Sequence, residues 1–155
     1  MNAASVEARF SEALRGATIH GPVPDEAVVD AEQELGVSFP PSLRVFLVLY
    51  GAALGKSFEL AGLPITDRRS PDEPPLWSHL VEQTTSARSD RFSKLQAHYV
   101  LLGDDGMDCR YLLDTREKDQ SGECPVVALG PGRDYERVAN SFVEFLERLS
   151  RGETP

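Results

Sequence analysis

Cysteine is scarce in this chain, whose 155 residues include only Cys109 and Cys124. Two cysteines are too few for the disulfide framework of a small secreted domain, and they lie too far apart for the paired spacing of a zinc site. Because disulfides are rare in the reducing cytosol, we expect two reduced, partly buried thiols. The cysteines therefore predict neither a disulfide scaffold nor a metal site.

Long apolar runs are also missing. No run approaches the roughly 20 apolar residues that a helix needs to span a bilayer. The N-terminal segment Met1–Phe10 does not contain the uninterrupted apolar core of a secretory signal. These two absences argue against a membrane-spanning or exported chain, and we expect a cytoplasmic protein.

The common motifs of catalysis and cofactor binding are absent as well. No Gly-x-Ser-x-Gly elbow is present to position a nucleophile, and Gly51–Gly55 and Gly130–Gly132 lack the Lys-Ser/Thr ending of a phosphate-binding loop. The three histidines, His20, His79 and His98, are scattered, and none has a neighbour that would make a metal pair on one helix face. We therefore expect no catalytic residue, no cofactor and no metal ion.

Acidic side chains, in contrast, are abundant. The chain has 25 Asp and Glu against 16 Lys and Arg, which gives a formal net charge of -9 and an isoelectric point near 4.8. Such a surface repels nucleic acid and anionic membranes, and its long-range field accelerates encounter with a basic partner. Moderate acidity also serves plain solubility. The charge alone therefore favours a basic partner without requiring one, and it argues against nucleic acid and membrane partners.

Length and hydrophobic content fit one domain. A chain of 17.0 kDa with 41% hydrophobic residues is large enough to bury a core without disulfides or metals. We expect a single domain over residues 1–155, with residues 151–155 as a frayed tail.

The first half of the chain predicts helices. Residues 3–15 carry apolar side chains at helical spacing, which predicts an N-terminal helix. Two further helices with a short connection are predicted between Pro24 and Gly51. Asp25 is placed to cap the first of them, Gly36 to end it and Pro41 to open the second, since proline can begin a helix but not continue one.

The second half predicts strands and two more helices. Ser57–Leu63 alternates briefly and suggests a short edge strand, Pro64–Pro75 is too rich in proline for anything but a surface loop, and residues 76–94 regain a helical pattern. Three apolar runs bounded by turn residues predict antiparallel strands: Tyr99–Leu102, Arg110–Asp114 and Pro125–Leu129. Ser141 and Glu144 form a capping box at the start of the last helix.

Taken in order, these elements predict an α+β domain with one mainly antiparallel sheet of about four to six strands, braced by about four to five helices. Several short motifs follow one another along the same elements. They are Glu34–Gly36, Phe39–Pro40, Tyr50–Gly51, Gly103–Gly106, Tyr111–Asp114, Gly122–Val126, and Ala139–Phe142 with Phe145–Leu146. In this order and spacing they resemble the SUKH superfamily over residues 24–149, whereas Pro64–Asp90 offers nothing that matches.

The resemblance implies a function in binding rather than in catalysis. Many members of this superfamily are bacterial immunity proteins, which bind a toxin from a competing or sibling cell, often a nuclease, and block it without turnover. The partner implied is a cognate toxin, and the net charge leads us to expect a basic one. The fungal members, which regulate cell-wall assembly, imply a different role as a cytoplasmic regulatory or scaffolding module. A small hydrolase that uses a carboxylate or histidine in a cleft is the weakest alternative.

Trp77 and a group of loop carboxylates are the candidate partner-binding residues. Tryptophan is enriched in interface hot spots, although the simpler interpretation is that Trp77 pins the preceding loop to the core. The carboxylates lie in loops that could share one rim of the sheet or be scattered over the surface: Glu59, Asp67, Asp72, Glu73, Asp104, Asp105 and Asp108.

The last three of these aspartates also raise the question of calcium. Hard cations prefer several oxygens on a tight loop, and Asp104, Asp105 and Asp108 surround Gly106. The calcium loop of an EF-hand requires a glutamate at its twelfth position, where this chain has Thr115. We therefore interpret the segment as a solvated turn between two strands.

Overall fold

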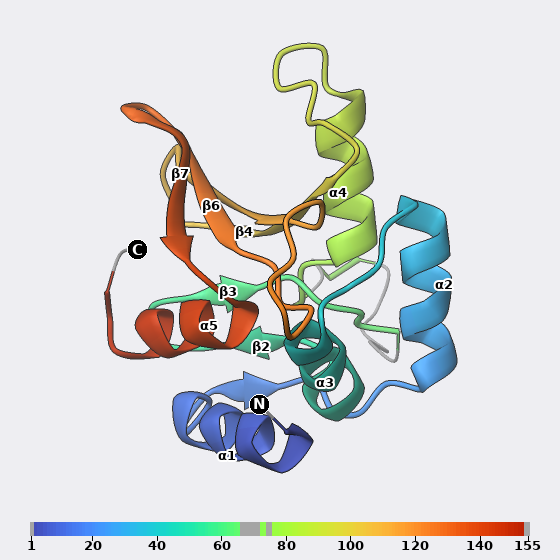
Figure 1. Ribbon diagram of the computed structural model, residues 1–155, viewed down its shortest axis with the longest axis vertical. Helices are drawn as coiled ribbons and strands as arrows, with labels where there is room; N and C mark the ends of the chain where they lie inside the picture. The colour runs from blue at the N-terminus through green and yellow to red at the C-terminus, as the bar shows by residue number, and fades with distance from the viewer. Residues whose placement is uncertain (1, 66–71, 74–75, 154–155) are drawn as a thin grey trace.

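The computed structural model of the chain describes residues 2–65, 72–73 and 76–153. Five helices and seven strands are formed within these residues (Figure 1). In chain order they are α1 (Ala3–Ala13), β1 (Thr18–Ile19), α2 (Asp25–Leu35), α3 (Pro41–Tyr50), β2 (Ala53–Leu54), β3 (Glu59–Leu60), α4 (Leu80–Ser89), β4 (Tyr99–Asp104), β5 (Arg110–Asp114), β6 (Val126–Gly130), β7 (Arg133–Ala139) and α5 (Phe142–Ser150). The predicted α+β class is confirmed.

The strands form two antiparallel sheets. The small sheet has the order β1-β2-β3, and the large sheet is a meander with the order β4-β5-β6-β7. We expected one mainly antiparallel sheet of about four to six strands from the sequence, and the division of the described strands into two sheets corrects this. The strands β1 and β2, of two residues each, are too short to show a pattern in the sequence, and β7 is mostly polar because it is an edge strand.

The two sheets meet where β3 approaches β4. The N–H of Ala61 donates to the carbonyl of Leu102 at 2.9 Å, at a bulge in β4. Gly103 follows with a φ of 157°, and a Cβ at this position would lie 2.8 Å from the carbonyl oxygen of Glu59. The absence of a side chain at Gly103 is therefore what lets β3 lie against β4.

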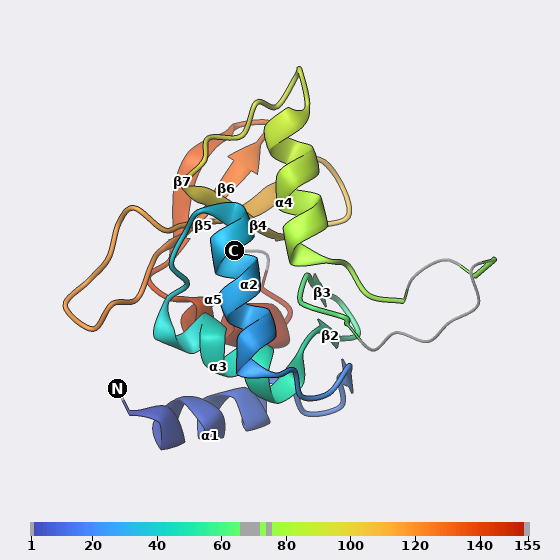
Figure 2. The ribbon, with the colours of Figure 1, turned by 90° about the vertical axis from the view of Figure 1, so that its right-hand side faces the viewer.

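The main core lies between the helices α1, α3 and α5 and the sheets. The rings of Phe10, Phe46 and Phe142, one from each of these helices, have centroids 5.2 to 6.0 Å apart. The side chains of Val100, Leu102 and other inward residues of the large sheet complete the cluster. Figures 1 and 2 show α1 lying below α3 and α5, away from the large sheet.

A smaller core lies on the opposite face of the large sheet, where α4 covers it. Leu101 and Leu112 point to this face, since their neighbours along each strand belong to the main core. Ala87 of α4 and Leu95 of the loop that follows pack against them. The large sheet is therefore covered by helices on both faces (Figure 2).

The five predicted helices are confirmed, with two corrections at their starts. Pro24, in extended conformation, is the N-cap of α2, and Asp25 is the first helical residue and not the cap. The second correction concerns α4, which begins at Leu80 rather than at residue 76. The preceding residues are held extended, because Gly62 pairs with His79 in a parallel bridge and its N–H donates to the carbonyl of Ser78 at 2.9 Å.

The predicted strands are confirmed at β3, β4, β5 and β6, and β3 lies at the edge of the small sheet as expected. The capping box is confirmed with a shift of one residue. Ser141 accepts from the N–H of Glu144 at 3.2 Å, and the Glu144 carboxylate accepts from the N–H of Asn140 at 2.8 Å, one residue before the cap. The predicted loop Pro64–Pro75 and the end of the predicted tail lie largely outside the described residues.

Candidate functional site

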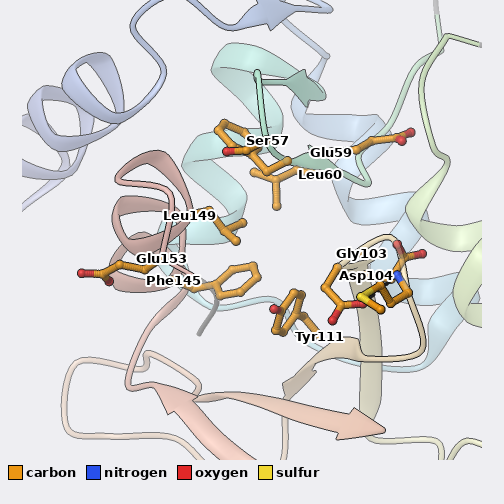
Figure 3. A pocket seen from close by; sticks show the side chains of 12 residues that line it. Ser57, Glu59, Leu60, Gly103, Asp104, Tyr111, Phe145, Leu149 and Glu153 are labelled. Atoms are coloured by element: carbon orange, nitrogen blue, oxygen red, sulfur yellow. Dashed lines mark hydrogen bonds between the residues drawn. The ribbon is translucent and has the colours of Figure 1, made fainter. Parts of the chain in front are cut away.

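A pocket of about 170 Å³ opens at the junction of the two sheets. It lies between β3, the turn that connects β4 to β5, and the C-terminal end of α5 (Figure 3). Since β3 is tied to β4 at Gly103, the same contact that joins the sheets forms one end of this pocket. The site is therefore built by segments that are far apart in the sequence.

The inner wall of the pocket is apolar. Leu60 of β3, Tyr111 of β5, and Phe145 and Leu149 of α5 line it, and all four are buried. The rings of Tyr111 and Phe145 lie side by side with centroids 5.0 Å apart, and Leu60 and Leu149 point toward each other across the space (Figure 3). The side chains are ordinary core residues that happen to lie where the core reaches the surface.

Four acidic residues contribute to the lining around this apolar wall, and the side chains of Glu59 and Glu153 extend away from the space (Figure 3). Glu59, Asp104, Asp105 and Glu153 belong to the lining, which contains no Lys, Arg or His. Glu59 accepts a hydrogen bond from the hydroxyl of Ser78, and Glu153 lies 3.3 Å from the Arg151 guanidinium. The pocket therefore combines an apolar interior with a negative rim.

The two aspartates of the rim also hold the β4–β5 turn. Oδ1 of Asp104 accepts from the N–H of Gly106 at 2.8 Å, and Oδ1 of Asp105 accepts from the N–H groups of Met107 and Cys109 at 2.9 and 3.2 Å. The interpretation of this segment as a solvated turn between strands is confirmed. No group of three or more His, Cys, Asp or Glu side chains in the described residues is placed to hold a metal ion.

Tyr111 is the one polar group in the apolar wall. Its side chain is 2% exposed, and its hydroxyl oxygen is shielded from solvent. Burial raises the pKa of Tyr111, and the neighbouring Cys109 and Asp105 act in the same direction, while Arg133 lowers it through its charge and a side-chain hydrogen bond. The Arg133 guanidinium also contacts Glu136 and the thiol of Cys109.

The pocket brings together only some of the carboxylates singled out in the sequence. Glu59, Asp104 and Asp105 line it, and Asp108 is exposed in the same turn without lining it. Asp72 and Glu73 are exposed and do not belong to the lining. Asp67 lies outside the described residues.

Trp77 does not belong to the pocket either. It is half-buried, and its ring meets that of His20 edge-on at a centroid distance of 5.9 Å. This contact ties residues 76–79 to the small sheet, as expected of a residue that pins a loop. A role of Trp77 in partner binding stays a prediction.

Sequence reasoning missed most of the pocket lining. The residues it did not single out are Ser57, Phe58, Leu60, Gly103, Met107, Tyr111, Phe145, Leu149 and Glu153. Most of them carried only the signal of strand or helix residues. Met107 was the exception that could have been noticed, since it is a large apolar residue inside an acidic turn, and it is 85% exposed.

No cysteine or histidine in the described part of the chain lines this pocket. Cys109 and Cys124 are both free and buried, and burial raises the pKa of the Cys124 thiol to about 11. His79 caps α4 by accepting from the N–H of Glu82, and His98 lies 3.8 Å from Asp114. Among the described residues there is no helix with the length and apolar character that crossing a bilayer requires.

A family model matches most of the chain. The model of the SMI1/KNR4 family, also described as SUKH-1, matches residues 22–148. The matched part includes β3, the β4–β5 turn and most of α5, and it leaves out α1. No curated protein matches the chain.

Proposed function

The chain belongs to the SMI1/KNR4 family (SUKH-1), and from this premise we propose that it is an immunity protein that neutralises a cognate bacterial toxin by direct binding. It acts as a single domain in the cytoplasm of the cell that makes it, in stoichiometric amounts and without catalysis. The observation that carries the proposal is the family match over residues 22–148.

The charge of the chain supports a basic toxin as the partner. With a net charge of -9 the protein attracts a cationic surface over a distance, which raises the association rate before any contact is made. Nucleases carry such surfaces because they bind the phosphate backbone. An acidic protein that occupies the same surface therefore competes directly with the nucleic acid.

The pocket at the sheet junction supports the idea that binding is specific. Electrostatic attraction sets the association rate, whereas the lifetime of a complex depends on a few buried anchor contacts. The pocket combines an apolar wall with a negative rim, so it suits an anchor with apolar and cationic parts. It gives the acidic surface one place where a partner side chain can be buried.

Co-expression with the toxin encoded beside this chain's gene tests the proposal. We expect that a host producing the toxin alone stops growing, and that a host producing both proteins grows at a normal rate. We also expect the purified proteins to elute together from a sizing column as a complex of equal stoichiometry. Unchanged toxicity together with separate elution would rule the proposal out.

Two controls keep this test specific. A toxin inactivated at its catalytic centre still has to bind the chain, because inhibition by binding does not require turnover. A toxin of the same reaction type from an unrelated system has to remain toxic, since recognition depends on the toxin's surface and not on its product. Protection against the unrelated toxin as well as the cognate toxin would point to a cause other than direct binding.

A further inference from the structure

We propose that the pocket at the sheet junction receives one arginine side chain of the partner protein. This inference rests on the proposed function in so far as the natural ligand belongs to a protein. It goes further by naming the group that is buried and the residues that bind it. The argument has three parts: the shape of the pocket, its charge, and the surface around its opening.

The shape of the pocket suits a long side chain with an apolar stem. Leu60, Phe145 and Leu149 form a buried wall against which methylene groups lose their contact with water. The volume of about 170 Å³ has room for one side chain and not for a helix or a strand. The occupant is therefore a single residue that projects from the partner's surface.

The charge of the rim decides the head group. Four carboxylates and no basic side chain line the pocket, so an anionic head group is repelled. Asp104 and Asp105 make their described hydrogen bonds through Oδ1, which leaves Oδ2 of both for a ligand. A guanidinium presents several N–H groups in one plane and can bind two carboxylates at once, whereas an ammonium is a point charge.

The surface around the opening suits a protein partner. Met107 is 85% exposed beside the rim, and Phe58 is half-buried at its edge. Exposed methionine adapts its shape to a partner surface, and apolar contacts around a buried anchor exclude water from it. Met107 and Phe58 are thus placed to cover the buried arginine once the partner is bound.

Titration of the full-length chain with a short peptide tests the inference without the toxin. The probes are acetyl-Gly-Arg-Gly-amide and the same peptide with citrulline, which has the shape of arginine without its charge. We expect the arginine peptide to shift the backbone amide NMR signals of Gly103, Asp104 and Tyr111 in a saturable way. We expect the citrulline peptide to bind at least about tenfold more weakly, since its head group is neutral.

Charge-neutral variants then locate the binding. Asp104→Asn/Asp105→Asn keeps the Oδ1 acceptors that hold the turn, so the fold is retained, and we expect it to weaken the arginine peptide about tenfold or more. Glu153→Gln, at an exposed position of the same rim, serves as a second variant and weakens binding less. The matched control is Asp30→Asn/Glu34→Gln on the exposed face of α2, which removes the same charge and leaves binding unchanged.

The outcomes are separate from those for the proposed function. Equal binding of both peptides, no saturable shift, or shifts spread over the whole acidic surface would overturn the arginine site. Protection against the toxin would then still stand as a test of the immunity function. Conversely, a pocket that binds arginine in a chain that protects against no toxin would remove the proposed function and retain the site.

Discussion

Arg9 and Glu147 show how a residue outside the family match becomes part of the fold. Nε and one terminal nitrogen of Arg9 on α1 each donate to a different carboxylate oxygen of Glu147 on α5, at 2.6 Å. The side chains are 31% and 26% exposed, so water screens the pair only in part. The hydrogen bond from Arg9 lowers the pKa of Glu147 and raises that of Arg9.

Replacing Glu147 tests this pair. We expect Glu147→Gln to lower the free energy of unfolding at pH 7 by about 1 kcal/mol. This is the upper end of the stabilisation that surface ion pairs contribute, and it is expected here because the pair is bidentate and partly buried. The folded-state pKa of Glu147 is lowered, so its contribution is complete above the unfolded value of about 4.3 and is lost as the pH falls through the folded-state value. Urea unfolding at several pH values measures the difference.

The exposed pair of Arg15 and Glu12 is the control for that measurement. Its side chains are 78% and 71% exposed, and we expect Glu12→Gln to leave the free energy of unfolding unchanged. If Glu147→Gln behaved like Glu12→Gln at pH 7, or if its effect persisted at low pH, the pair would contribute nothing through charge.

Individual residues of the pocket differ in how far the sequence could predict them. Asp104 and Asp105 stood out because a run of acidic and glycine residues between two apolar runs is typical of an exposed turn. Tyr111 and Phe145 did not stand out, because an aromatic residue in an apolar run is found in any core strand or helix. Whether such a residue faces a pocket depends on where α5 ends relative to β5, and that is set by tertiary packing.

At the scale of elements, Gly103 is the position on which the two sheets depend. Its missing side chain lets the Glu59 carbonyl approach, next to a bulge in the pairing of β4 with β5. The sequence showed Gly103 only as part of a turn. Close approach of a second sheet leaves no local signal, because the contact involves residues more than 40 positions away.

A methyl group at this position tests the junction. We expect Gly103→Ala to destabilise the chain by about 1 to 3 kcal/mol, since the Cβ would lie 2.8 Å from a backbone oxygen that belongs to another sheet. Gly132→Ala is the matched control, because Gly132 also has a positive φ, of 75°, and nothing lies within 4 Å of its Cβ. The difference between the two variants in urea unfolding isolates the clash from the backbone strain. An equal loss of unfolding free energy in the two variants would mean that β3 can move away from β4 at little cost.

The segment after β5 caps a helix from a distance. The buried carboxylate of Glu123 accepts from the N–H and the hydroxyl of Ser42 at 3.0 and 2.7 Å, in the first turn of α3. The N-cap residue Pro40 has no side chain that can accept a hydrogen bond, so the Glu123 carboxylate caps the helix in its place. A negative group at a helix N-terminus is also favoured by the helix dipole.

Removal of this carboxylate leaves two buried donors without a partner. We expect Glu123→Ala to lower the free energy of unfolding by about 2 kcal/mol or more, and Glu123→Gln, which keeps an acceptor, to cost less. Glu117→Ala on the exposed part of the same segment controls for loss of charge there. Both are measured by urea unfolding at pH 7. A Glu123→Ala variant as stable as Glu117→Ala would show that water takes over the cap.

The elements that sequence patterns predicted are those whose local pattern agrees with their burial. The stripe of α5 and the apolar runs of β4, β5 and β6 show this agreement, and all four elements form where expected. The strand β7 was missed because Asp134, Glu136 and Arg137 are exposed on an edge. Neither β1 nor β2 has a pattern of its own, and both form because α1 and α3 bring them together.

At the scale of the whole molecule, one core connects both sheets with the helices. The main cluster includes Val6 of α1, Leu60 of the small sheet and Val100 of the large sheet. We therefore expect one cooperative unfolding transition in urea. The fluorescence of Trp77, the single tryptophan, reports on the region of the small sheet, and far-ultraviolet circular dichroism reports on the helices. Different midpoints for the two signals would mean that α1 or the small sheet unfolds independently.

The net charge acts on a partner before contact, and the pocket acts after it, so the two should separate in the kinetics. We expect the association rate constant with the cognate toxin to fall at least about tenfold from low to high salt, while the dissociation rate changes little. Removing two charges on α2, with Asp30→Asn/Glu34→Gln, should slow association slightly and leave dissociation unchanged.

Removing two charges at the pocket, with Asp104→Asn/Asp105→Asn, should slow association by the same small factor, because the net charge changes equally. It should in addition accelerate dissociation about tenfold or more, since the buried head group loses its partners. Stopped-flow measurements of both variants at two salt concentrations resolve these effects. If the two variants behaved alike in dissociation, the field of the whole molecule would account for binding, and the junction of the sheets would have no special part in it.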